Sequence, residues 1–269
     1  MINRLINLFR SRAFKKSDFR FNGKIPSDLP AIFIFPEDKT PFVAALPLYF
    51  SLKNYHKKIA ALGIPDISPA FKYHFPTDEF VEYNPQKPES FVRFKDSVIY
   101  LGSIFRDSFH NFPEICRGRF SVAYMGFSSH YNFLVDTDFD SYSSFVSNFL
   151  RILTIPDLTE EFKKKLHLPP KSRGDRVFMD FKNPSKLKKR YLDQVRNKGF
   201  STFRYQELEF IGDLPFDKQL EILSSSCCLV SDDSLFTGYA LHYGIPVYSE
   251  NCSKYYKNQL CKELREFVR

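Results

Sequence analysis

Residues 227–246 read CCLVSDDSLFTGYALHYGIP, and this stretch decides the fold of the C-terminal half. The apolar residues 227–230 predict a buried strand, and two acids and a serine follow it directly. A helix-like segment comes next and ends at Gly244 and Pro246. Such an arrangement is typical of an anion site, because the first N–H groups of a helix lack intrahelical partners and form its positive dipole end. The stretch therefore predicts a strand, an anion-binding loop and a helix.

The same alternation of strands and helices runs through both halves of the chain. The predicted strands are residues 31–35, 58–63, 96–102, 119–126, 176–181, 200–205, 207–212 and 227–230. The predicted helices are residues 41–55, 105–118, 142–155, 185–198, 216–225, the segment that residues 233–238 open, and 252–268. Alternation of this kind is the signature of parallel sheets built from βαβ units.

Residues 158–175 carry charge, two prolines and a glycine, which is typical of a link between domains. We therefore expect an α/β protein with two Rossmann-like domains, residues 1–157 and 158–269. Their mainly parallel sheets are expected to face each other across a cleft, with ligands beyond the carboxyl ends of the strands.

Composition limits the class of protein. The chain has 269 residues, of which 43% are hydrophobic, so it can bury a substantial core. The formal net charge of +8 suits phosphorylated ligands, nucleic acid or an anionic membrane surface, although a lysine-rich composition that only keeps the protein soluble is the alternative. No nucleic-acid-binding motif is present, so nucleic acid is not an expected partner.

Five cysteines are present, an odd number, and no C-x-x-C motif occurs. Neither a disulfide framework nor a zinc site is indicated, which favours a reducing cytoplasm, and no metal or cofactor is expected. No apolar stretch approaches the ~18 residues of a membrane-spanning helix. The N-terminus also lacks the apolar centre of a signal peptide.

Residues 1–16 read MINRLINLFRSRAFKK and predict an amphipathic helix. Ile2, Leu5, Ile6 and Phe9 fall on one helical face, and arginines and lysines surround them. Such a helix either lies on an anionic membrane surface or packs on its own domain. We expect a cytoplasmic protein, with peripheral contact to the inner membrane in the first case.

Residues 211–248, IGDLPFDKQLEILSSSCCLVSDDSLFTGYALHYGIPVY, carry a family resemblance. They resemble the segment of the bacterial heptosyltransferases of lipopolysaccharide synthesis (glycosyltransferase family 9, GT-B fold) in which D-[ST]-G-x-x-H opens a helix and G-x-P closes it. AIFIF at residues 31–35 and VAALPLYFSLK at residues 43–53 are similar to the family's first strand and helix. The resemblance covers most of residues 30–250.

The resemblance implies a transferase that moves a sugar from a nucleotide-sugar to lipopolysaccharide or to another saccharide or lipid-linked acceptor. It implies that Asp233 binds sugar hydroxyls. The residues it implies for the donor and its phosphates are Asp233, Ser234, Thr237, Gly238, Lys182 and Lys186. The two lysines follow the predicted strand 176–181, and a solvated helix face is the alternative interpretation of them.

The loop after the first strand departs from the family. The family has G-D there and uses the aspartate as the base that activates the acceptor, whereas this chain has Thr40 and Pro41. Glu37 and Asp38 lie in the same loop and are the candidate catalytic bases, with ordinary loop acids as the alternative.

The donor motif departs from the family as well. Leu235 and Gly238 replace the family's glycine and histidine, and Tyr205 runs almost directly into Glu207 where the family has a further helix. These losses favour the alternative function, a catalytically inactive GT-B-like protein that serves as a binding or assembly module for a protein partner. Both functions stay open at this point.

Overall fold

A computed structural model describes residues 25–84, 93–105, 107, 109, 112, 120–124, 131, 133–135, 140–166, 168–172, 174, 176–181, 201–202 and 214–268. The predicted helix of residues 1–16 and the predicted phosphate contacts Lys182 and Lys186 lie outside these residues. Membrane contact by residues 1–16 therefore remains a prediction. None of the helices in the described ranges is long and apolar enough to cross a membrane.

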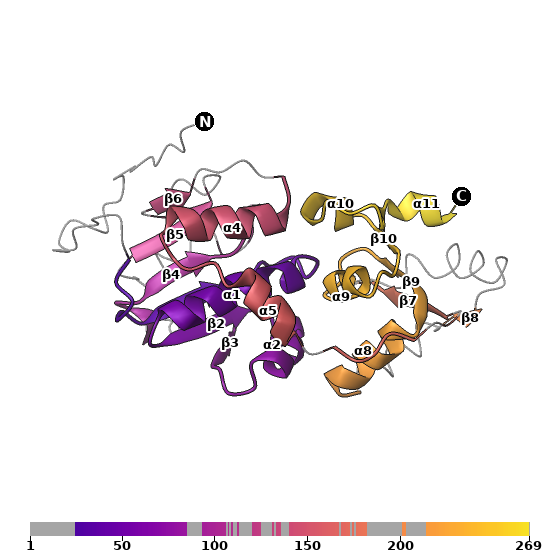
Figure 1. The fold of residues 1–269 in the computed structure, drawn as a ribbon, viewed down its shortest axis with the longest axis horizontal. Helices are drawn as coiled ribbons and strands as arrows, with labels where there is room; N and C mark the ends of the chain where they lie inside the picture. The colour runs from indigo at the N-terminus through magenta and orange to yellow at the C-terminus, as the bar shows by residue number, and fades with distance from the viewer. Residues whose placement is uncertain are drawn as a thin grey trace. The chain divides into compact units, whose positions relative to one another are not determined.

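The chain forms two compact units (Figure 1). Unit 1 contains the described residues up to Glu37 and then Ala44–Lys165, and unit 2 contains Asp38–Val43 and Leu166–Arg269. The predicted C-terminal domain starts at residue 158, whereas α5 (Thr159–Lys165) belongs to unit 1. Phe162 explains this placement, because its ring packs against Phe50 and Phe75 of unit 1.

Unit 1 is built on a parallel sheet. Within the described residues its strand order is β3-β2-β1-β4-β5-β6, and every pair is parallel. The strands are β1 (Ala31–Ile34), β2 (Ile59–Gly63), β3 (Phe80–Glu82), β4 (Val98–Leu101), β5 (Phe120–Tyr124) and β6 (Phe133–Val135). The helical elements are α1 (Phe42–Tyr55), η2 (Pro65–Ile67), α2 (Ser68–His74), α4 (Tyr142–Ile152) and α5. This order is that of a Rossmann sheet, in which β1 and β4 are central.

Two helices cover one face of this sheet. Phe33 of β1 and Tyr100 of β4 are register partners, so their side chains share a face. Phe33 packs against Tyr49 of α1, and Tyr100 packs against Phe149 of α4. Helices α1 and α4 therefore lie on the same side of the strands (Figure 1).

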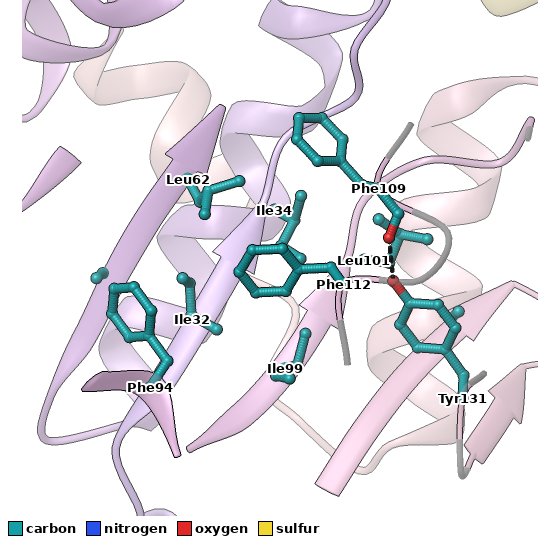
Figure 2. Packing of buried hydrophobic residues seen from close by; sticks show 11 residues of the cluster. Ile32, Ile34, Leu62, Phe94, Ile99, Leu101, Phe109, Phe112 and Tyr131 are labelled. Atoms are coloured by element: carbon teal, nitrogen blue, oxygen red, sulfur yellow. Dashed lines mark hydrogen bonds between the residues drawn. The ribbon is translucent and has the colours of Figure 1, made fainter. Parts of the chain in front are cut away.

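The opposite face carries the apolar cluster of Figure 2. Strand alternation sends the other side chains of β1 and β4 to this face, and all of them are fully buried. The labelled members are Ile32, Ile34, Leu62, Phe94, Ile99, Leu101, Phe109, Phe112 and Tyr131. The phenol of Tyr131 donates a hydrogen bond to the carbonyl of Phe109 at 3.1 Å, so the polar atom of this ring is satisfied inside the cluster.

Unit 2 contains a second parallel sheet. Its strand order is β11-β10-β9-β7-β8 within the described residues. The strands are β7 (Arg176–Asp180), β8 (Ser201–Thr202), β9 (Ser226–Ser231), β10 (Val247–Ser249) and β11 (Cys261–Lys262). The helices are α8 (Phe216–Ser224), α9 (Thr237–His242), α10 (Cys252–Tyr255) and α11 (Leu264–Val268). The predicted fold class, α/β with two Rossmann-like parallel sheets, is confirmed.

The C-terminal segment corrects two predictions. The single helix predicted for residues 252–268 is instead α10, a short strand β11 and α11. Cys252 and Cys261, for which no disulfide was expected, form a disulfide across this segment. The sequence pattern missed it because the two cysteines become neighbours only when β11 pairs with β10 and α10 packs beside them.

Loss of this disulfide is expected to lower the free energy of unfolding by about 2 kcal/mol, since it closes only a short loop of the unfolded chain. Urea denaturation of the wild type with and without dithiothreitol would measure the difference. Cys227→Ser is the control, because Cys227 is not disulfide-bonded and this variant should lose the same stability on reduction as the wild type. Identical curves for the oxidised and reduced wild type would contradict the prediction.

Candidate functional site

Three carboxylates gather at the carboxyl edge of the unit 2 sheet. Strands β7 and β9 are neighbours, and Asp180 lies opposite Ser231, so Asp180 comes close to Asp232 and Asp233. Ser234 is fully buried and donates a hydrogen bond to Asp180 at 2.6 Å. Burial raises the pKa of Asp180, and the negative charges of Asp232 and Asp233 raise it further. The predicted anion-binding loop is therefore a buried and strongly acidic place.

Asp233 is held by the segment Asp38–Val43, which belongs to unit 2. Its carboxylate accepts hydrogen bonds from the backbone N–H of Lys39 at 3.2 Å and of Thr40 at 2.9 Å. The Thr40 hydroxyl donates a third at 2.9 Å. Asp233 is 2% exposed and Thr40 is 0% exposed. The carboxylate that the resemblance assigns to a donor sugar thus binds the chain's own backbone.

Asp38, a predicted base, is held in the same way. Its carboxylate accepts hydrogen bonds from the Lys254 ammonium at 3.3 Å and from the Tyr255 phenol. The Tyr256 phenol donates to the Thr40 carbonyl at 3.1 Å. Three consecutive residues at the end of α10 therefore hold the segment Asp38–Val43 in place.

Gly238 lies against this segment as well. A Cβ atom at position 238 would lie 2.4 Å from the Val43 Cβ and 2.7 Å from the Tyr256 phenol oxygen, distances that real Cβ atoms do not reach. A histidine side chain at position 238 would not fit here, because Val43 occupies the space that it would need.

The helix that was predicted to open at residues 233–238 begins only at Thr237. Thr237 is fully buried, and among the described residues its hydroxyl has no hydrogen-bond partner. Asp233, Ser234, Thr237 and Gly238 are thus brought together, but as a buried loop packed under residues 38–43. Lys182 and Lys186 lie outside the described residues.

Alanine at position 238 should strain this packing. We expect Gly238→Ala to lower the free energy of unfolding by about 1–3 kcal/mol, as overpacking of a filled core does. Chemical denaturation of Gly238→Ala, Val43→Gly and the double variant would measure the coupling between the two positions. The double variant should be more stable than the sum of the single effects predicts, because Val43→Gly removes the nearest atoms. Strictly additive effects would show that the two positions do not touch.

Unit 1 holds a second group of acids, which the sequence pattern did not single out. Asp107 follows β4 and accepts hydrogen bonds from the Ser103 hydroxyl and, at 3.0 Å, from the backbone N–H of Phe109. Burial raises the pKa of Asp107 to about 6, and the carboxylate of Glu37 adds to the shift. Burial also raises the pKa of Tyr83, as do the charges of Glu37 and Asp107.

Glu37, a predicted base, therefore lies with Asp107 beyond the carboxyl ends of β1 and β4. A carboxyl group whose pKa lies near neutrality can take a proton from a hydroxyl group in general base catalysis. One signal could have identified Asp107 in the sequence, since it lies shortly after the predicted strand 96–102, at the sheet edge where parallel α/β folds bind ligands. Its raised pKa depends on burial, which the sequence does not display.

Groups of at least three His, Cys, Asp or Glu side chains that could hold a metal ion are absent from the part of the chain that the structure describes. The three carboxylates at the edge of unit 2 thus do not form a metal centre by geometry. Asp233 and Asp180 accept the backbone and hydroxyl hydrogen bonds described above, and the charge of Lys39 acts on Asp180.

Comparison with known proteins gives no match to a protein-family profile and none to a curated protein. Solved structures do match. A glycosyl transferase of family 9 from Veillonella parvula DSM 2008 superposes with a TM-score of 0.53 and 10% identity, over 85% of this chain and 82% of that one. The E. coli heptosyltransferase WaaC with ADP superposes with a TM-score of 0.51 and 8% identity, over 81% of this chain and 86% of that one. The chain therefore has the fold of the family 9 heptosyltransferases.

Proposed function

We propose that this chain is a protein of glycosyltransferase fold that does not transfer sugar and acts as a binding module. The observation that carries the proposal is the state of Asp233, which is buried and accepts three hydrogen bonds from Lys39 and Thr40. A sugar hydroxyl could reach this carboxylate only after residues 38–43 had left, which would expose buried polar groups at a substantial cost.

The charge of the same place supports this proposal. Sugar transfer from a nucleotide donor leaves a diphosphate, and its negative charge must be stabilised by positive groups. Asp232 and Asp233 place negative charge at the predicted position, and the charge of Lys39 beside Asp180 opposes it there. A diphosphate placed there would be repelled.

A second function, sugar transfer, is favoured by Asp107. Its pKa of about 6 suits a base that takes a proton from an acceptor hydroxyl, with Glu37 beside it. The E. coli heptosyltransferase WaaC, whose fold this chain shares, was solved with ADP. In this alternative the donor is a nucleotide-sugar and the acceptor is lipopolysaccharide or another saccharide, and residues 38–43 leave unit 2 before the donor binds.

Isothermal titration with ADP, UDP, GDP and their sugar conjugates tests the binding-module proposal. We expect no binding of the wild type tighter than about 1 mM. Ser234→Asp is the matched variant, because it adds a negative charge to the predicted donor position. The proposal would be overturned in favour of sugar transfer if the wild type bound a nucleotide in the low micromolar range and Ser234→Asp did not.

An assay for nucleoside diphosphate release from a nucleotide-sugar distinguishes the two functions directly. The binding-module function predicts that the wild type and Asp107→Asn give the same background rate. The transfer function predicts a rate that rises with pH through about 6 and is lost in Asp107→Asn.

A further inference from the structure

A pocket of about 560 Å³ lies in unit 1 at the amino-terminal edge of its sheet. Its wall includes Ala31 and Ile59, the first residues of β1 and β2, and Ser97, which directly precedes β4. Ala31 lies opposite both Ile59 and Val98, so β1 runs between the two other strands. The candidate residues described above lie beyond the carboxyl ends of strands, so this pocket is a separate place in the fold.

Positive charge predominates around this pocket. Its wall holds five cationic side chains and two carboxylates. The cationic residues are Lys53, Lys57, Lys58, Arg93 and Lys95. Lys53 pairs with Asp78 at 2.6 Å and Arg93 pairs with Glu79 at 2.8 Å, so each carboxylate already has a cationic partner.

The three remaining lysines of the wall make no ion pair within the described residues. Lys57, Lys58 and Lys95 are exposed, and among the described residues their ammonium groups take part in no hydrogen bond or ion pair. Lys57 and Lys58 precede β2 and Lys95 precedes β4, so their backbones lie on both sides of β1, about 10 Å apart at a strand spacing of ~4.8 Å. Like charges around one pocket repel each other, and a bound anion would relieve that repulsion.

The inner wall of the pocket is buried and uncharged at His56 and Phe94. His56 is buried, and its Nε2 accepts a hydrogen bond from the Tyr100 phenol at 2.8 Å while its Nδ1 donates to the Leu29 carbonyl at 3.0 Å. Burial lowers the pKa of His56, so the ring is neutral at pH 7. Phe94 is also buried, and the Arg93 guanidinium lies over its ring at 4.8 Å. These contacts fix the side chains of the inner wall, and the exposed lysines supply the charge at the rim of the pocket.

We propose that this pocket binds a small molecule that carries two phosphate monoester groups, one held by Lys57 and Lys58 and the other by Lys95. The pocket volume is that of a small-molecule site. Lysine is a point-charge partner for phosphate and does not demand one fixed geometry. Soluble sugar bisphosphates and lipid headgroups that carry two phosphate monoesters share this chemistry.

Isothermal titration of the full chain with fructose 1,6-bisphosphate at low salt tests the proposal. We expect binding in the micromolar range, weakened about tenfold or more in Lys57→Gln/Lys95→Gln. Lys163→Gln/Lys164→Gln is the matched control, because it removes the same charge from the exposed surface of α5 and should leave the affinity unchanged. The proposal would be overturned if the wild type bound neither the bisphosphate nor vesicles that carry the same headgroup chemistry. An equal loss of affinity in the control variant Lys163→Gln/Lys164→Gln would also overturn it.

Vesicles of phosphatidylcholine with a minor fraction of phosphatidylinositol 4,5-bisphosphate, whose headgroup carries two phosphate monoesters, test the lipid source. The pocket would be assigned to a lipid headgroup if the wild type sediments with these vesicles, Lys57→Gln/Lys95→Gln does not, and bisphosphate binding is weak. Vesicle binding that both double variants keep, without bisphosphate binding, would overturn the proposal. The bisphosphate is titrated for the unit 1 pocket and the nucleotides for the loop of unit 2, so failure here and failure of the proposed function are distinguishable.

Discussion

Asp233→Ala is expected to lower the free energy of unfolding by about 3–4 kcal/mol, the largest effect of any single substitution considered for this chain. The carboxylate accepts hydrogen bonds from two backbone N–H groups and one hydroxyl, all in a buried place. Alanine leaves these donors without a partner, and a buried donor without a partner costs the folded state its full desolvation penalty. Urea denaturation followed by circular dichroism measures the change.

Two further variants show whether the carboxylate itself is responsible. Asp233→Asn keeps one acceptor oxygen and should lose about half as much stability as alanine. Asp217→Ala removes an acid from the first turn of α8 and should cost at most about 0.5 kcal/mol. A loss below about 1 kcal/mol for Asp233→Ala would mean that residues 38–43 are held by other contacts, and would weaken the argument that the donor position is closed.

Asp107→Asn is expected to stabilise the protein above pH 6, by up to about 3 kcal/mol at pH 8. Burial raises the pKa of Asp107 from 3.8 to about 6, so between these values the folded protein binds more protons than the unfolded chain. The free energy of unfolding must therefore fall as the pH rises through this window, by about 3 kcal/mol for the full shift. Asparagine cannot ionise, which removes that fall.

Denaturation curves between pH 4 and pH 8 test this directly, because the wild type and Asp107→Asn should diverge as the pH rises. Asp66→Asn, at an exposed position of unit 1, is the control and should follow the wild type. Glu37→Gln should move the wild-type transition to lower pH, since the Glu37 charge is one cause of the shift. Parallel curves for the wild type and Asp107→Asn would show that folding does not raise the pKa of Asp107.

The architecture of this protein was predictable from local pattern. Apolar runs such as AIFIF at residues 31–35 and CCLV at residues 227–230, each followed by a helical period, specify parallel strands that are buried on both faces. Because ligands bind beyond the carboxyl ends of such strands, the sequence pattern also predicts that Asp233 and Ser234 lie at that edge of the sheet. These features depend on periodicity and chain order, which a sequence displays directly.

The state of the site was decided by tertiary structure alone. Thr40 and Asp233 are 193 residues apart in the chain, and no local pattern indicates that one closes over the other. The clash between a side chain at position 238 and Val43, the disulfide of Cys252 with Cys261 and the raised pKa of Asp107 arise in the same way. Each of these features depends on which distant groups are buried together, away from water. Burial is a property of the folded chain, whereas the sequence specifies only which groups are available to be buried.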